Sequence, residues 1–353
     1  MILNNKRVAV IGAGPVGLTI ARLLQQKGIS VTVYERDKDK HSRIWGGTLD
    51  LHQGSGQLAL KEAGLLDRYF ALAIPMGRII ADKQCNVLYS VKPNYESPEI
   101  NRNDLRMMLL ESLHDETVVW DRKFTSLETH NGQWLLHFEN KPDAIADVVI
   151  GANGGLSKVR QYVTDSEVEL TGTYIIQGEI SQPEINCPDF YNYCDNNILM
   201  TACNGINLVA NPKNNGALTY NVTFKTLALK VFGHWHERYQ QLFRSTPFFA
   251  NLPARKLSLD KPWKKDRPLP ITLIGDAAHV MPPFAGEGVN TGLVDALVLS
   301  ANLTSGEFGT IEAAIPDYEQ KMFMYATKAQ LETSRNEADM HQPDFSFVKR
   351  FLS

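Results

Sequence analysis

The most constraining feature of the sequence is a glycine-rich segment near the N-terminus, RVAVIGAGPVGLTIARLLQQKGISVTVYER at residues 7–36. Its glycines, Gly12, Gly14 and Gly17, have the spacing G-x-G-x-x-G and separate an apolar run from an amphipathic one. This pattern predicts a buried strand, a helix and a second strand, over residues 8–11, 15–27 and 30–34. The segment therefore indicates a βαβ unit, the starting element of a doubly wound sheet.

The same segment indicates a dinucleotide site. Gly12 allows the tight turn, Gly14 lets the backbone approach a pyrophosphate, and Gly17 lets the helix pack closely on the strand. The helix N-terminus directs unpaired N–H groups and the positive end of its dipole at phosphates. Glu35 closes the second strand, where a carboxylate can accept hydrogen bonds from a ribose. A purely structural βαβ turn is the alternative, and the motif alone does not separate FAD from NAD(P).

Length and charge narrow the classes of function. With 353 residues the chain exceeds the usual size of one core, so we expect two domains or one domain with a large insertion. A net charge of -3, from 36 basic and 39 acidic residues, gives no electrostatic reason to expect nucleic acid. We find no signal peptide, no run of membrane-spanning length and no metal-binding cysteine spacing, and expect a cytoplasmic protein.

A second glycine-rich stretch lies late in the chain, at residues 269–290. An apolar strand ends at Gly275 and Asp276, and a helix is predicted from about 289 to 299. Asp276 is placed to accept hydrogen bonds from ligand hydroxyls, and the helix directs its positive end into the turn. We interpret the neighbouring His279 as a structural residue.

Between the two glycine-rich stretches, residues 172–224 consist of short β-rich runs. Asn214-Asn215-Gly216 predicts a hairpin between the last two of them. An antiparallel sheet inserted into the α/β domain would provide a wall for a substrate pocket. Elsewhere the pattern predicts helices over 57–71 and 311–339, a strand over 118–127, and a helix containing Lys158 and Arg160.

Taken together, these features resemble the FAD-dependent aromatic hydroxylases, the class A flavoprotein monooxygenases. The resemblance rests on GAGPVG with Glu35-Arg36, on the helix entry Arg102-x-x-Leu105, and on the Gly275-Asp276 turn. The sequence is most similar to the TetX-type tetracycline-inactivating monooxygenases, the tetracycline destructases. Runs such as VYERD, GGTLDLH, INRNDLR, NGGLSKVR, IGDAAH and MPPFAG carry that similarity along nearly the whole chain.

The resemblance implies an α/β fold with a Rossmann-like FAD-binding domain (GR2-type), an inserted antiparallel β-sheet substrate domain and a long C-terminal helix. The FAD-binding domain would comprise residues 1–65, 101–165 and 255–310. The substrate-binding domain would comprise residues 66–100 and 166–254, followed by a C-terminal bridging helix and tail at 311–353. The resemblance also implies a monomer.

It implies tightly bound FAD, with the adenosine on Glu35 and Arg36. Arg43 and Asp50 would lie beside the cofactor, Arg102 would contact it, and Asp276 would approach the ribityl or pyrophosphate region. The other cofactor contacts would be Gly12, Gly14, Pro15, Val16, Gly17, Pro283, Gly286, Glu287, Gly288 and Val289, of which the last five would border the isoalloxazine.

The chemistry of that family needs neither a metal nor a protein nucleophile, so we expect no catalytic side chain. NADPH, bound transiently, would reduce FAD, and O₂ would give a flavin C4a-hydroperoxide that hydroxylates an electron-rich carbon of a polycyclic, tetracycline-like substrate. This activity would inactivate the antibiotic. The alternatives are hydroxylation of another polyketide or phenol, a halogenase or flavin reductase on the same fold, and a flavoprotein that binds the drug without turnover.

The substrate wall both matches and departs from the tetracycline destructases. Matching residues are Gln177, Met200, Pro283, Phe284, Asn336, Met340 and Phe347. Ile198, Val209, Thr219 and Asn221 stand where those enzymes have arginine, phenylalanine, histidine and glycine, although Thr219 and Asn221 would still face the substrate. Glu287 replaces a glutamine, and could cap the following helix or oppose the charge of reduced flavin. The segment between Phe224 and Trp235 is also short, through a deletion or a loop missing from the sequence.

Overall fold

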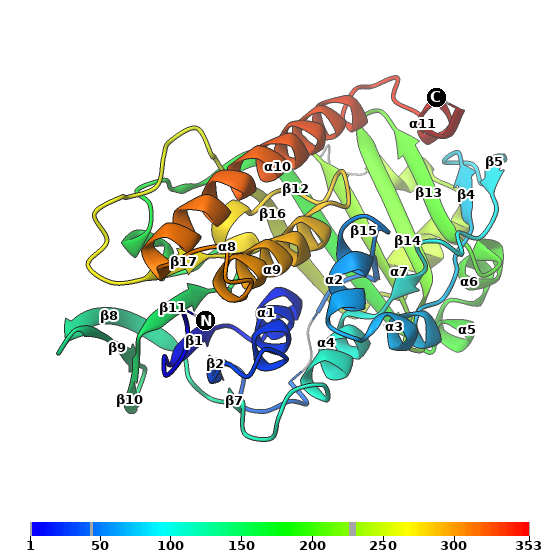
Figure 1. Ribbon diagram of the computed structural model, residues 1–353. Helices are drawn as coiled ribbons and strands as arrows, with labels where there is room; N and C mark the ends of the chain where they lie inside the picture. Colours follow the sequence, from blue (N-terminus) through cyan, green and yellow to red (C-terminus); the bar gives the residue numbers. More distant parts are fainter. Residues whose placement is uncertain (1, 43–44, 226–230, 353) are drawn as a thin grey trace.

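The structure is a computed structural model that describes residues 2–42, 45–225 and 231–352. Two sheets lie side by side, and the long helix α10 (Ile311–Met340) extends across both (Figure 1). Residues 226–230, inside the segment that is short relative to the family, lie outside the described residues. Pro316 lies within the first turns of α10, which begins at a Thr310 cap whose hydroxyl accepts a hydrogen bond from Ala313 N–H.

A parallel sheet forms the centre of the first half. Its strand order is β17-β11-β1-β2-β7, and all of its pairings are parallel. The strands are β1 (Val8–Ile11), β2 (Val31–Tyr34), β7 (Val118–Val119), β11 (Val148–Gly151) and β17 (Ile271–Leu273). The β1 strand is buried on both faces, as its continuous apolar run predicts. The β1 and β2 strands thus follow the sequence prediction.

Helices pack against this sheet and against each other. The α1 helix (Pro15–Gln25) packs on α9 (Gly288–Thr304) and α4 (Arg102–Leu110), so the two glycine-rich stretches lie side by side. Asn101 caps α4 by accepting hydrogen bonds from the N–H groups of Asn103 and Asp104. The remaining helices of this half are α2 (Gly56–Glu62), α3 (Leu66–Leu72) and the short α8 (Asp276–His279).

A three-stranded antiparallel sheet, β10-β9-β8, packs on the parallel sheet through the rings of Tyr34 and Phe138, whose centroids are 4.9 Å apart. Its strands are β8 (Phe124–His130), β9 (Gln133–Phe138) and β10 (Lys141–Ala146). A two-stranded pair joins β3 (Leu49–Asp50) to β6 (Glu99–Ile100).

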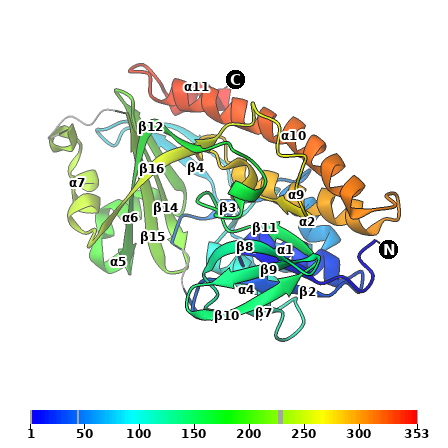
Figure 2. The ribbon, with the colours of Figure 1, turned by 90° about the vertical axis from the view of Figure 1, so that its left-hand side faces the viewer.

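The second half is built on a seven-stranded sheet of order β16-β12-β15-β14-β13-β4-β5. Its strands are β4 (Arg78–Ala81), β5 (Val87–Val91), β12 (Val168–Ser181), β13 (Ile198–Cys203), β14 (Ile206–Asn214), β15 (Ala217–Phe224) and β16 (Phe249–Leu257). Helices α5 (Pro183–Asn186), α6 (Pro188–Cys194) and α7 (Glu237–Arg244) cover one face, and the parallel-sheet half lies on the other side (Figure 2). The C-terminal helix α11 (Phe347–Leu352) packs near β13.

Three local predictions are wrong. The single helix expected over 57–71 is two helices, because Gly64 adopts a left-handed conformation with φ +72°. The strand expected over 118–127 is divided, because β7 pairs with the parallel sheet whereas β8 pairs with β9. The helix expected at Lys158 and Arg160 is only a 3₁₀ turn, Arg160–Tyr162. This segment is fixed by the Arg160 side chain, which bonds the carbonyl of Ala277.

The fold class expected from the sequence is confirmed: an α/β fold with an antiparallel sheet and a long C-terminal helix. Within the described ranges, no helix combines the length and apolar character needed to cross a bilayer. The division into domains stays a prediction.

Candidate cofactor site

The three glycines of the N-terminal turn have different roles. Gly12 has φ +112°, and a Cβ there would lie 2.6 Å from the carbonyl oxygen of Ala152. At Gly17 a Cβ would lie 2.1 Å from the carbonyl oxygen of Gly12. At Gly14 a Cβ would meet no atom within 4 Å. The fold therefore requires glycine at positions 12 and 17. At position 14 the absence of a side chain instead leaves space in which a ligand can approach the backbone.

The Glu35 carboxylate lies directly against this turn. It accepts hydrogen bonds from the N–H groups of Ala13 (2.6 Å) and Asp37 (3.0 Å), and it is buried. Arg106 also holds the turn in place. Its Nε donates a hydrogen bond to the carbonyl of Ala13 (3.1 Å), and its Nη2 forms an ion pair with Asp37 (2.9 Å). Arg36 is exposed beside Glu35.

A buried network holds the second glycine turn. The Asp295 carboxylate of α9 accepts a hydrogen bond from Gly275 N–H (2.7 Å) and from the hydroxyl of Tyr325 (2.6 Å). Its Oδ2 also lies 2.7 Å from Nε2 of His279. Burial acts to lower the pKa of His279, but the charge of Asp295 outweighs it and raises that pKa. His279 is fully buried, as a structural residue should be.

The two glycine turns face a common cavity of about 280 Å³. Its walls come from distant parts of the chain: Gly14, Pro15, Val16, Leu49, Arg102, Ala152, Gly154, Ile274, Gly275, Asp276, Met281, Pro283, Gly286, Gly288 and Val289. The starts of α1 and α9 both contribute residues to it, so the positive ends of two helix dipoles lie at its edge.

The polar groups of the cavity suit a ligand with phosphates and hydroxyls. The Arg102 side chain donates from Nε to the carbonyl of Gly47 (2.9 Å), and its other guanidinium N–H groups have no partner among the described residues. Burial lowers the pKa of Arg102, against the nearby charge of Asp276. Asp276 is exposed, and Arg160 holds its backbone in place through a 3.1 Å hydrogen bond to its carbonyl. The Arg102 guanidinium can therefore bind a phosphate, and the exposed Asp276 carboxylate can accept hydrogen bonds from hydroxyl groups. This combination suits a dinucleotide.

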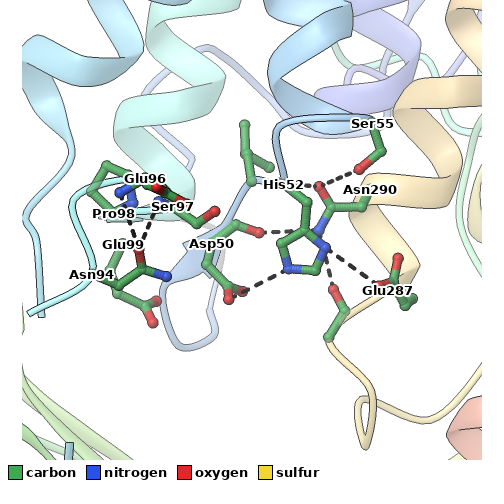
Figure 3. Close-up of polar contacts among 12 residues, drawn as sticks. Asp50, His52, Ser55, Asn94, Glu96, Ser97, Pro98, Glu99, Glu287 and Asn290 are labelled. Carbon is green, nitrogen blue, oxygen red and sulfur yellow. Dashed lines mark hydrogen bonds and ion pairs between the residues drawn. The ribbon is translucent and has the colours of Figure 1, made fainter. Parts of the chain in front are cut away.

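A polar cluster borders the cavity where β3 meets the start of α9 (Figure 3). His52 lies between two carboxylates: its Nε2 is 3.6 Å from Asp50 Oδ2 and its Nδ1 is 3.3 Å from Glu287 Oε1. Asn290 accepts a hydrogen bond from His52 N–H (2.9 Å) and donates to the carbonyl of Asp50 (3.1 Å). Glu287 makes no capping hydrogen bond to α9, so its side chain is directed to His52 instead.

The expected substrate residues share one face of the large sheet. Gln177, Asn221, Val209, Met200 and Ile80 are successive register partners and form one row across five strands. Thr219 lies in the next row, where it is the register partner of Glu179. It is buried, and its hydroxyl accepts a hydrogen bond from the Asn214 side chain. Asn211, on the same face, donates to Thr48 beside β3. The row therefore faces the half of the protein that holds the cavity.

An apolar cluster joins the row to the second glycine turn. Phe284, Met340 and Phe347 are buried together with Ile80, and Met200 and Val209 pack against them. Asn336 donates to the carbonyl of Phe284 (3.1 Å), and Pro283 lies on the cavity wall. Ile198 is buried at the edge of this face.

Comparison with known proteins identifies the family. A family model described as an FAD binding domain matches residues 5–199 and 254–328. The chain is a member of this family, the class A flavin monooxygenases. It is accordingly an FAD-dependent monooxygenase.

One sequence relative and two solved structures illustrate what this flavin monooxygenase is similar to. A 3-amino-4-hydroxybenzoate 2-monooxygenase of Streptomyces cremeus is 26% identical over 98% of this chain and 90% of its own length. The solved structure of tetracycline destructase Tet(55) has a TM-score of 0.80 at 21% identity and covers 100% of this chain and 95% of its own. HpxO of Klebsiella pneumoniae, solved with FAD, has a TM-score of 0.80 at 19% identity, over 98% and 93%. The two structures show the shared fold.

Most of the residues selected from the sequence converge on the cavity or on the sheet face beside it. Arg43 lies outside the described residues. The roles of the others as FAD or substrate contacts stay predictions. Sequence reasoning missed the supporting residues Arg106, Arg160, Asp295 and Asn290, and the placement of His52 between two acids. The only signal for the last was that His52 follows Asp50 at a strand end.

Proposed function

We propose that this flavin monooxygenase consumes NAD(P)H and O₂ to hydroxylate a planar, electron-rich enol or phenol, with tetracycline-like polycyclic compounds as the first candidates. One observation carries this proposal. Phe284, next to the cavity-lining Pro283, packs in the same cluster as Met200 and Val209 of the sheet row. A substrate on that row would lie beside the turn expected at the isoalloxazine. We also expect the enzyme to act as a monomer.

Bound FAD would supply the redox chemistry and the activated oxygen. The residues of this chain would bind and orient. Arg102 and the starts of α1 and α9 would hold the phosphates, Asp276 and Glu35 would accept hydrogen bonds from hydroxyls, and the sheet row would fix the substrate ring. Arg43 is proposed to contact the cofactor on the resemblance alone.

The sheet row is polar at one end and apolar at the other. Gln177 and Asn221 are register partners, and neither side-chain amide has a hydrogen-bond partner among the described residues. At the other end, Met200 and Val209 pack with Phe347 of α11. Such a surface suits a planar ring system with a hydroxyl or carbonyl at one edge. The fold shared with Tet(55) supports tetracyclines among the candidates.

A smaller phenol is the second candidate. Ile198 and Thr219 are buried, at positions where tetracycline destructases have arginine and histidine. The cation and imidazole that would hold the polar edge of a tetracycline are therefore replaced by an alkyl group and a hydroxyl already bonded to Asn214.

An oxygen-transfer assay tests the proposal. The FAD-loaded protein is incubated with NADPH in air-saturated buffer with each of a panel of tetracyclines and simple phenols. The masses of the products are measured by mass spectrometry. We expect NADPH consumption that depends on the compound, and a product heavier by one oxygen atom. NADPH consumption with hydrogen peroxide release and unchanged compounds throughout the panel would contradict the assigned substrates. Gln177→Ala should lower the yield of product per NADPH, whereas Glu128→Gln on the distant β8 should not.

A further inference from the structure

Glu287 carries a charge at the start of α9, in the turn that also contributes Gly286 and Gly288 to the cavity. If FAD lies beside this turn, the Glu287 carboxylate would repel the negative charge that FAD gains when it is reduced. Two carboxylates, Asp50 and Glu287, lie there on either side of the His52 ring, and Asp50 Oδ1 is 3.9 Å from the position of a Cβ on Gly286. Unless something compensates them, they would disfavour reduction.

His52 is placed to compensate both. Each of its ring nitrogens lies within 4 Å of one carboxylate, so an imidazolium can form ion pairs with Asp50 at Nε2 and with Glu287 at Nδ1 (Figure 3). Contact with Asp50 and Glu287 raises the pKa of His52 to about 10, although partial burial acts against this. The other charged groups nearby, Arg78 and Glu99, pair with each other beyond Asp50.

The position of His52 is also fixed mechanically. Its backbone N–H donates to Asn290 of α9, and the hydroxyl of Ser55 donates to the same oxygen (3.3 Å). Asn290 in turn donates to the carbonyls of Asp50 and Gly286. The end of β3 and the start of α9 are therefore held together, and Asn290 is fully buried. These hydrogen bonds fix the backbone of His52 close to the turn that carries Glu287.

We propose that His52 is a positioning residue for the flavin: as a cation it neutralises one of the two carboxylates at the cavity edge and so sets how readily bound FAD is reduced. This proposal goes beyond the hydroxylase activity, but it rests on the proposed placement of the turn beside the isoalloxazine. The three groups together carry one negative charge. Removing the cation leaves two negative charges, and removing the Glu287 charge leaves none.

This charge balance gives two single variants with opposite signs. His52→Gln should lower the affinity for reduced FAD relative to oxidised FAD by about tenfold, because a carboxylate pair is left uncompensated near the cofactor. Glu287→Gln should shift the same ratio the other way by several-fold and should still bind FAD. In the double variant the net charge is restored, so the ratio should return to within about threefold of the wild type.

The measurement is a double-mutant cycle on the midpoint potential of bound FAD, determined anaerobically against a redox dye, with oxidised-FAD affinity measured by fluorescence. Opposite shifts that cancel in the double variant support the proposal. Unchanged potentials, or two shifts of the same sign, would overturn it. Glu139→Gln, which removes an exposed carboxylate paired with Lys123 on the distant three-stranded sheet, is the matched control.

A second readout needs no cofactor. In the FAD-free protein, an NMR titration of the His52 ring should show it protonated well above neutral pH, and Glu287→Gln should lower its pKa. Titration near the ordinary 6.5 would overturn the proposal. The titration also distinguishes failure of the His52 proposal from failure of the proposed function. A protein that binds no FAD would contradict the proposed function, but the titration would still test the pairing of His52 with Asp50 and Glu287.

Discussion

His279 Nε2 and Asp295 Oδ2 lie 2.7 Å apart, and neither side chain is exposed to solvent. The pair links the second glycine turn to α9, and Asp295 also accepts hydrogen bonds from Gly275 N–H and Tyr325. One carboxylate thus fixes the cofactor turn to two helices. The cost of losing its charge should be far larger than for a surface carboxylate.

We therefore expect Asp295→Asn to lower the free energy of unfolding by about 3–5 kcal/mol, because an uncompensated imidazole and unbonded donors would remain buried. Denaturant unfolding of the FAD-free protein measures this. Glu139→Gln, at an exposed ion pair with Lys123, should cost less than about 1 kcal/mol. Equal effects of the two substitutions would rule out a structural role for the Asp295 network.

Gly14 should respond to substitution differently from Gly17. Gly14→Ala meets no protein atom, but its methyl group enters the cavity, so FAD affinity should fall while FAD-free stability changes by less than about 1 kcal/mol. Gly17→Ala places its methyl group against the carbonyl of Gly12 and should destabilise the protein itself. Isothermal titration with FAD and thermal unfolding separate the effects. Undiminished FAD affinity in Gly14→Ala would contradict the assignment of the cavity.

Arg102→Gln should weaken FAD binding without weakening the fold. Its cation is half-buried and has no bonded carboxylate among the residues that the structure describes, so removing the charge should leave FAD-free stability unchanged or slightly higher. Loss of a charge-assisted hydrogen bond to the cofactor should lower FAD affinity by about 10- to 100-fold. A variant that unfolds more easily but keeps full FAD affinity would show that Arg102 serves the fold instead.

His52 should make stability depend on pH in a defined window. Its pKa is raised from 6.5 to about 10 by Asp50 and Glu287, so its stabilising effect is complete below pH 6.5. That effect is lost as the pH rises from 6.5 through about 10. The Tm difference between wild type and His52→Gln, measured on FAD-free protein, should therefore be largest near pH 6.5 and shrink towards pH 10. For His130→Gln, at an exposed hairpin, we expect a small difference at every pH.

The sequence allowed prediction of those parts of the fold that local pattern controls. The run before Gly12, the hairpin at Asn214–Gly216 and the helix after Gly288 each carry their own signal, and each forms as expected. The helix expected over 57–71 failed at Gly64, where one residue with a positive φ outweighed an apolar pattern that continues through it.

Partners distant in sequence could not be predicted. Nothing in the local sequence indicates that Arg160 bonds the carbonyl of Ala277, or that His52 meets Glu287. Each of these contacts joins segments far apart in the chain, which only the packing of the whole fold brings together. The resemblance to flavin monooxygenases suggested the residues around the cofactor, but only the structure showed which of them support one another.

The cavity wall combines the turn at Gly14 with the turn at Gly288, and β1 pairs on one side with β11, which comes much later in the chain. During synthesis, the first glycine turn therefore leaves the ribosome long before its counterpart exists. We therefore expect FAD to bind only after α9 has emerged and the parallel sheet has assembled. Chains truncated before α9 should remain without flavin however much FAD the cell contains.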